Sequence, residues 1–193
     1  TIIEAIIEPM LGYDYLARPV KLVPLTLREM PEVSNNGSSY TFKLKQGIVF
    51  ADDPVFKGKT RELVAQDYAY SIRRLFDPSL RSPWLFLLDG KIIGMDEVVA
   101  KAQANNKFDY DAPIAGLEVV DRHTLRINLK EPDYNLLYIL AMPTLGALAR
   151  EVVEQYGDDI SGHPVGTGPY VLKSWARGHK MILEANPKFR ESF

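Results

Sequence analysis

The three histidines are the residues most able to act as a general base or to bind a metal, and none has a suitable neighbour in the sequence. His123, His163 and His179 all fall in predicted turns, and none stands at a metal-ligand spacing from another. The chain has no cysteine, which excludes disulfides, thiolate metal sites and cysteine nucleophiles. No Gly-x-Ser-x-Gly nucleophile motif occurs either. The sequence therefore predicts no metal site, no cofactor and no catalytic centre, and we expect His123 to be solvated.

Two acidic pairs and one glycine-rich stretch are the other candidates for ion binding. Asp52-Asp53 and Asp158-Asp159 lack the loop spacing of an EF-hand, so we expect solvated turn carboxylates. Residues 164–170 read Pro-Val-Gly-Thr-Gly-Pro-Tyr, whereas a phosphate-binding P-loop needs Gly-x-x-x-x-Gly-Lys-Ser/Thr at the start of a helix. A strand-forming run follows here instead. This stretch predicts a rigid corner in which the glycines adopt conformations that other residues resist.

Aromatic residues provide the remaining candidates for a binding site. Residues 82–88, Ser-Pro-Trp-Leu-Phe-Leu-Leu, are unusually apolar for a segment bracketed by turns. In such a position the rings of Trp84 and Phe86 either cover the core or line a ligand cleft. Composition favours the core, and both interpretations stay open at this point.

The composition is that of a globular protein without an affinity for polyanions. Of the 193 residues, 46% are hydrophobic and 25% are charged. A chain of this length buries roughly 70% of its unfolded surface, so it needs no disulfides for stability. The net charge of -2 offers no basic field for a nucleic acid. Thr1 begins the chain without the basic region of a signal peptide, so we expect that none was present or that it was removed.

Hydrophobic periodicity predicts a mixture of helices and hairpins. Helices are expected where apolar residues recur every three to four positions, and strands where they alternate with polar ones. Because the strands follow one another in hairpins, most pairs should be antiparallel, which gives a mixed α/β (α+β) fold. The expected helices cover about 2–8, 65–76, 95–104, 134–140 and 145–156, and the expected strands 40–45, 117–120, 125–129, 171–175 and 181–185.

Segments spread over almost the whole chain carry a resemblance to a known family. They are residues 40–50, 64–74, 119–125, 164–170 and 183–189. In the same order they are similar to the Tyr-Thr-Phe-x-Leu-x-x-Gly-x-x-Phe, Thr-Ala-acidic-Asp-Val-x-x-Ser-x-x-Arg, Val-Asp-x-x-Thr, Pro-x-Gly-Thr-Gly-Pro-Tyr and Leu-Glu-x-Asn-Pro-x-Tyr motifs of the family 5 extracellular solute-binding proteins. These are the oligopeptide-, dipeptide- and nickel-binding components of bacterial ABC importers.

Two residues depart from the family motifs. Asp53 stands where the family usually has glycine, and Val64 replaces a threonine, which removes a side-chain cap from the following helix. Neither departure touches ligand chemistry, and both suggest a divergent subgroup.

The resemblance implies an incomplete type II periplasmic-binding-protein-like lobe with hairpins, a mixed sheet and flanking helices. Members of the family are much longer and fold as two lobes around a cleft. By that comparison, residues 1–25 and 163–193 form the base of the first lobe and residues 26–162 an inserted subdomain. The second lobe is absent, so the sequence resembles an N-terminal fragment.

The resemblance also implies a function without catalysis. A small solute, by this comparison a peptide, would be captured between two lobes and delivered to a membrane permease. The compartment would be the periplasm, or the cell exterior with a membrane anchor in a Gram-positive source. Nickel chelates, haem and sugars also use this scaffold, so the solute is left open. The alternative is an interaction or dimerisation module derived from such a lobe.

The resemblance assigns one ligand contact on this chain. In peptide-binding relatives, the loop after the Ser-x-x-Arg helix places an aromatic residue in the cleft. Trp84 stands at the matching position, with Pro83 and Phe86 beside it. The carboxylate that typically holds the amino terminus of a peptide belongs to the second lobe, so no residue here takes that role.

Overall fold

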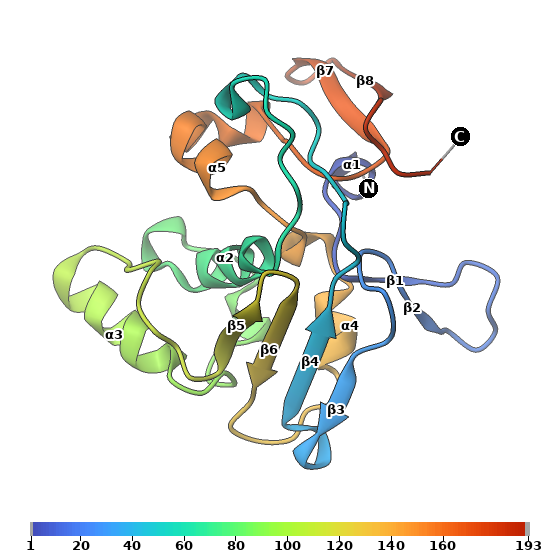
Figure 1. Cartoon of the computed structure of the whole chain (residues 1–193). Coiled ribbons are helices and arrows are strands. Elements are labelled where there is room, and N and C mark those ends of the chain that lie inside the picture. The colour runs from blue at the N-terminus through green and yellow to red at the C-terminus, as the bar shows by residue number, and fades with distance from the viewer. Residues whose placement is uncertain (1, 192–193) are drawn as a thin grey trace.

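The computed structural model describes residues 2–191, which form three small antiparallel sheets and five helices with short 3-10 turns between them (Figure 1). Every pair of adjacent strands in this part of the chain is antiparallel, so the expected fold class of helices with hairpins is confirmed, whereas its sheets are purely antiparallel and not mixed. The helices are α1 (Ile2–Ile6), α2 (Ala65–Phe76), α3 (Met95–Asn105), α4 (Leu136–Leu140) and α5 (Arg150–Tyr156). The strands are β1 (Leu11–Tyr13), β2 (Leu22–Pro24), β3 (Glu32–Ser34), β4 (Ser39–Lys43), β5 (Leu117–Asp121), β6 (Thr124–Asn128), β7 (Tyr170–Ala176) and β8 (Lys180–Ala185).

A four-stranded sheet in the order β3-β4-β6-β5 lies at the centre of the core. Alternation along β4 turns Tyr40 and Phe42 inward, and Phe42 pairs with Leu125 of β6. The turn between β3 and β4 contains Asn36 and Gly37, both with positive φ, as the Asn-Gly pair predicts. Helix α2 packs against β5 and β6 on one face of this sheet. The hairpins expected from sequence are therefore confirmed in this sheet.

Helix α2 is the main helical component of the core. Its apolar stripe, Tyr68, Ile72, Leu75 and Phe76, is buried as the spacing predicts. The helix begins after Val64, whose backbone is extended, and the Asp67 carboxylate accepts a hydrogen bond from the Val64 N–H at 2.9 Å. Valine has no oxygen to complete a reciprocal cap, so only half of a capping box is present.

The 164–170 corner crosses close against the end of α1. Gly168 N–H donates to the Ile6 carbonyl at 2.9 Å, and Ala51 N–H donates to the Gly166 carbonyl at 2.9 Å. A Cβ on Gly166 would lie 1.9 Å from the Ile6 oxygen, and one on Gly168 would lie 2.6 Å from the Ala5 oxygen. Neither glycine has a positive φ. The unusual glycine conformations expected from the sequence are therefore absent from this corner, and the glycines are required instead by the close approach of the backbone.

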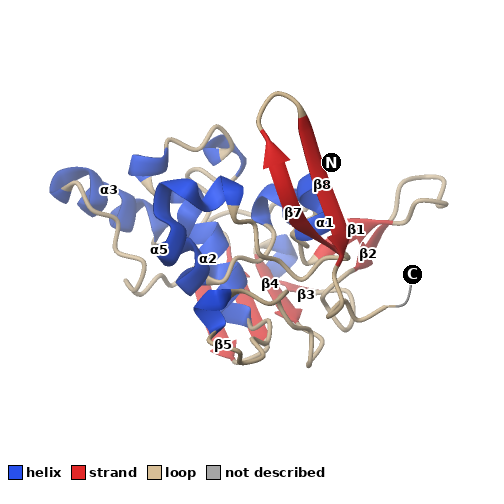
Figure 2. Ribbon diagram, turned by 90° about the horizontal axis from the view of Figure 1, so that it is seen from above, coloured by secondary structure: helices blue, strands red, loops and turns tan. Residues whose placement is uncertain are grey.

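A buried polar cluster joins residues from both ends of the chain beside this corner. Glu8 is 6% exposed and accepts hydrogen bonds from Thr167 Oγ1 at 2.7 Å and from both terminal nitrogens of Arg190 at 2.7 and 2.9 Å. Tyr68 Oη donates to the Glu8 backbone carbonyl at 3.1 Å. The hairpin β7–β8 follows the corner and packs on α1, apart from the four-stranded sheet (Figure 2).

The helix expected over residues 145–156 begins only at Arg150. A 3-10 turn, Pro143–Leu145, precedes it, and Gly146 and Ala149 have extended backbones. In this extended stretch Ala147 N–H donates to the Glu8 carbonyl at 3.1 Å and Leu148 N–H donates to Ser71 Oγ at 3.1 Å. Tertiary hydrogen bonds therefore replace the first turns of the expected helix. Gly157, expected as the C-cap, follows the last helical residue with a φ of 51°.

Candidate functional site

The loop of residues 82–88 presents two aromatic rings at the surface. Trp84 is 42% exposed and Phe86 is 68% exposed, and their ring centroids lie 6.5 Å apart. Pro83 is also exposed. A 3-10 turn, Leu85–Leu87, carries the rings, and the buried Leu88 anchors it in the core. The rings are thus held at the surface by an apolar anchor.

The end of α2 positions this loop. Asp77 follows the helix and accepts hydrogen bonds from Ser79 N–H at 2.9 Å and Ser79 Oγ at 2.7 Å. Its other carboxylate oxygen accepts a bond of 2.5 Å from Tyr110 Oη. Burial, followed by this hydrogen bond, raises the pKa of the Tyr110 phenol. The start of the loop is therefore tied to a distant segment of the chain. Contact of Pro83, Trp84 and Phe86 with a ligand remains a prediction, for which their exposure is a necessary condition.

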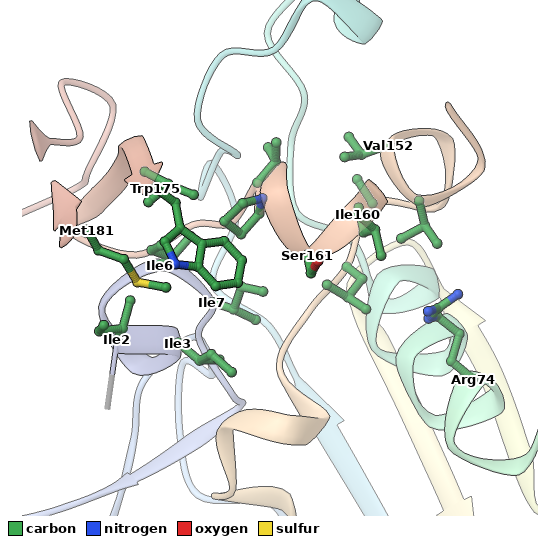
Figure 3. A pocket seen from close by; sticks show the side chains of 16 residues that line it. Ile2, Ile3, Ile6, Ile7, Arg74, Val152, Ile160, Ser161, Trp175 and Met181 are labelled. Atoms are coloured by element: carbon green, nitrogen blue, oxygen red, sulfur yellow. The ribbon is translucent and has the colours of Figure 1, made fainter. Parts of the chain in front are cut away.

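An apolar pocket of about 370 Å³ lies between α1, α5 and the β7–β8 hairpin (Figure 3). Trp175 and Met181 border it on the hairpin side, and Ile2, Ile3 and Ile6 on the α1 side. The polar groups on its lining are few, notably Arg74 and Ser161. Sequence reasoning did not find this pocket. A hint in the sequence is Trp175, a large apolar residue that directly follows the polar Lys173 and Ser174 in the strand.

His123 is paired and not solvated, contrary to the sequence expectation. Its Nε2 lies 2.9 Å from Glu62 Oε1, and Glu62 Oε2 accepts a bond of 2.9 Å from Arg122 Nη2. Gly47 N–H also donates to Glu62 Oε1 at 2.9 Å. The Gly47 hydrogen bond, followed by those of Arg122 and His123, lowers the pKa of Glu62 to about 2. The cluster joins the β5–β6 turn to the segment that precedes α2.

Asp53 and His163 make structural contacts, whereas Asp158, Asp159 and His179 are exposed. Asp53 accepts from Val55 N–H at 2.9 Å and from Tyr156 Oη at 3.0 Å, so it caps a turn instead of being merely solvated. The ring of His163 stacks on that of Tyr156, with centroids 4.0 Å apart. Within residues 2–191, no group of three histidine or acidic side chains is arranged to hold a metal ion. None of the helices in the same range has the length and apolar character that a bilayer crossing requires.

Comparisons with known proteins agree on one family. Residues 21–192 match the model described as bacterial extracellular solute-binding proteins, family 5 middle. The chain is 28% identical over 153 residues to the periplasmic oligopeptide-binding protein OppA of Salmonella typhimurium, covering 78% of this chain and 26% of that protein. It is 32% identical over 168 residues to di/tripeptide-binding protein 2 of Pseudomonas aeruginosa, covering 84% of this chain and 29% of that protein.

A similarity to solved structures extends over nearly the whole chain. Listeria monocytogenes OppA bound to peptide superimposes with a TM-score of 0.80 at 23% identity, over 98% of this chain and 35% of that one. The chain therefore spans about a quarter to a third of the length of these proteins. Since the family match covers residues 21–192, the chain belongs to family 5 of the bacterial extracellular solute-binding proteins.

Proposed function

We propose that this chain is part of the substrate-binding component of an ABC importer and supplies one wall of a peptide-binding cleft. The observation that carries the proposal is the family match over residues 21–192, joined to relatives whose names specify oligopeptides, dipeptides and tripeptides. The protein would bind its solute without chemically changing it and deliver it to a membrane permease. Its compartment would be the periplasm or the cell exterior, and no second function is favoured by the relatives.

Trp84 is the proposed peptide contact, with Pro83 and Phe86 beside it. A partly exposed indole next to a second ring offers apolar area and a hydrogen-bond donor at low conformational cost. A peptide could lie across such a surface while a facing wall encloses it, as in clefts that close on their ligand.

The division of the chain into parts belongs to the same proposal. Residues 1–25 and 163–193 would form the base of a first lobe, and residues 26–162 an inserted subdomain. The relatives are about three to four times as long as the region they share with this chain. In a protein of that length, the apolar pocket beside Trp175 would be covered by further parts of the base, and a second lobe would complete the cleft.

The test uses the two tryptophans as separate reporters in the 193-residue chain. One wall of a cleft should bind a peptide only weakly, with a dissociation constant near 1 mM or above, because the facing contacts are missing. Trialanine at millimolar concentrations should shift the indole N–H signal of Trp84 in a two-dimensional NMR spectrum. The signal of Trp175, assigned by Trp175→Phe, should stay in place.

The control variant for this test is Trp175→Phe, which should leave the titration of Trp84 unchanged. Phe86→Ala should weaken the shift by removing the neighbouring ring. The assignment of Trp84 is wrong if saturating trialanine shifts only the indole N–H signal of Trp175. It is also wrong if neither indole signal shifts at a trialanine concentration 20-fold above the expected dissociation constant. Family membership would survive that result, because it rests on the match over residues 21–192.

A further inference from the structure

Arg73 of α2 is a buried arginine whose charge is not matched by an ion pair. The residue is 7% exposed, and Nη1 donates to the Ala112 carbonyl at 2.8 Å. Its Nε is buried and has no hydrogen-bond partner among residues 2–191. None of the ion pairs formed within that range includes Arg73. Burying a guanidinium in this way is costly unless an anion compensates it.

Arg73 lines a polar pocket of about 340 Å³. Arg61 and Arg150 also line it, but both already have carboxylate partners. Arg61 binds Asp67 at 2.7 Å, and Arg150 binds Asp111 at 2.6 Å. Arg73 is therefore the arginine of this pocket that has a buried, unsatisfied donor.

The walls of the pocket suit a guanidinium-bound anion. The rings of Tyr70 and Tyr110 lie 5.2 Å apart, and the Arg150 guanidinium carbon lies 5.9 Å from each ring centroid. Arg150 is thus held over aromatic faces, as arginines that recognise planar oxyanions commonly are. Asp111, whose side chain is 74% exposed, pairs with Arg150, and with Asp109 it favours the charge of Arg73 only through space, without a direct hydrogen bond. An incoming oxyanion would compete with this exposed carboxylate.

We propose that this pocket binds one oxyanion group, a carboxylate or a phosphate, with Arg73 as the primary cation and Arg150 as the second. Two guanidinium groups can donate several charge-assisted hydrogen bonds to such a group. The pocket shares no lining residue with the loop of residues 82–88, so the inference stands apart from the proposed peptide contact. Its volume leaves room for an oxyanion that carries a small organic group.

The first experiment observes the arginine directly. Nε–H signals of the 193-residue chain are followed by NMR during titration with sodium phosphate or sodium acetate, and with sodium chloride at matched ionic strength. We expect the Arg73 signal to shift in a saturable manner with phosphate, acetate or both, and not with chloride. The phosphate and acetate arms show which oxyanion is preferred. An Arg73 signal that neither anion moves overturns the proposal.

Variants then separate binding from structure. Arg73→Met should weaken oxyanion binding at least 10-fold, whereas Asp111→Asn should strengthen it by removing the competing carboxylate. Arg177→Met, which removes an equal charge beside Trp175, should leave affinity within twofold of the wild type. Without added anion, Arg73→Met should unfold at the same temperature as the wild type or a higher one, because an unmatched buried charge is lost.

A purely structural Arg73 gives the opposite pattern. Arg73→Met would then lower the melting temperature, and Asp111→Asn would not strengthen binding. If Arg73→Met fails to fold, the wild-type titration and Asp111→Asn still decide the matter, since neither depends on that variant.

Discussion

In the 164–170 corner, the neighbouring atoms decide which residue type fits at a position, and the backbone conformation of that position does not. Gly166 has an ordinary backbone conformation, yet its hydrogen atoms face the carbonyl of Ile6 so closely that no side chain fits. The corner thereby brings β7 against α1 and places Thr167 on the buried Glu8 carboxylate at 2.7 Å.

Gly166→Ala should strongly destabilise the protein. The added Cβ would lie 1.9 Å from the Ile6 oxygen, and a backbone oxygen cannot move aside without displacing α1. We expect a loss of at least about 3 kcal/mol in unfolding free energy, measured by urea denaturation. Gly162→Ala is the matched control, because a Cβ added there would have no atom within 4 Å and the φ of Gly162 is not positive. Equal stability of the two variants would contradict the close approach.

Glu62→Gln should reveal a stabilisation that depends on pH. The pKa of Glu62 is lowered from 4.5 to about 2, so its ionised form stabilises the folded chain. This contribution is fully present above about pH 4.5 and is lost as the pH falls from 4.5 toward 2. At pH 7 the variant should be about 1 kcal/mol less stable than the wild type, a value reduced by solvent screening.

The measurement for Glu62 is urea unfolding of wild type and variant between pH 7 and pH 2. The difference in unfolding free energy should shrink over the acidic part of that range. Glu118→Gln is the control, because among residues 2–191 the Glu118 carboxylate has one ion-pair partner, Arg126 at 3.2 Å on an exposed strand face. A difference for Glu62→Gln that stays constant down to pH 2 would refute the lowered pKa.

Among the elements, α2 links the core to both candidate sites. One face buries Tyr68, Ile72 and Phe76 against the sheet, while Arg73 reaches the oxyanion pocket. The loop of residues 82–88 follows shortly after the last turn of α2. At its first turn, the Asp67 carboxylate both caps Val64 N–H and pairs with Arg61, so the buried charge is matched.

Val64→Thr should stabilise α2 by completing its capping box. Val64 already has the extended backbone of an N-cap, with a φ of -129° and a ψ of 164°, and threonine has nearly the same shape. We expect an increase of about 1 kcal/mol in unfolding free energy and of roughly 2–4 °C in melting temperature. Val64→Ala, which adds no cap, should not raise stability. A melting temperature for Val64→Thr no higher than that of the wild type would contradict the prediction.

At the scale of the whole molecule, the apolar pocket between α1, α5 and β7–β8 is a feature that the fold by itself leaves unexplained. Its lining is almost entirely apolar and part of it is exposed, including Ile3 at 54% and Trp175 at 37%. Exposed apolar hollows of this kind mark surfaces that pack against other protein. This agrees with the proposal that further parts of a longer protein cover it.

The exposed pocket should bind an apolar dye in the 193-residue chain. We expect 8-anilinonaphthalene-1-sulfonate to fluoresce on binding, and Ile3→Glu to reduce that signal by more than half by placing a charge on the lining. Val20→Glu is the matched control, since Val20 is 63% exposed but lies outside the pocket. Equal dye binding by the two variants would show that this pocket is not the site.

The sequence by itself determined the elements whose patterns are local. The stripe of α2 and the alternation of β4 specified which face is buried, because a period of 3.6 or 2 follows from backbone geometry alone. The motifs in the 40–50 and 164–170 segments pointed to the family. Trp84 was identified as an aromatic in an apolar loop, and that resemblance made it a ligand candidate.

Only the tertiary structure decided which distant groups meet. The pairing of His123 with Glu62, the buried Nε of Arg73 without a hydrogen-bond partner and the late start of α5 all depend on contacts between segments far apart in the chain. No local pattern encodes such contacts. Burial and hydrogen bonding arise from the packed arrangement, whereas periodicity reports only what neighbours along the chain prefer.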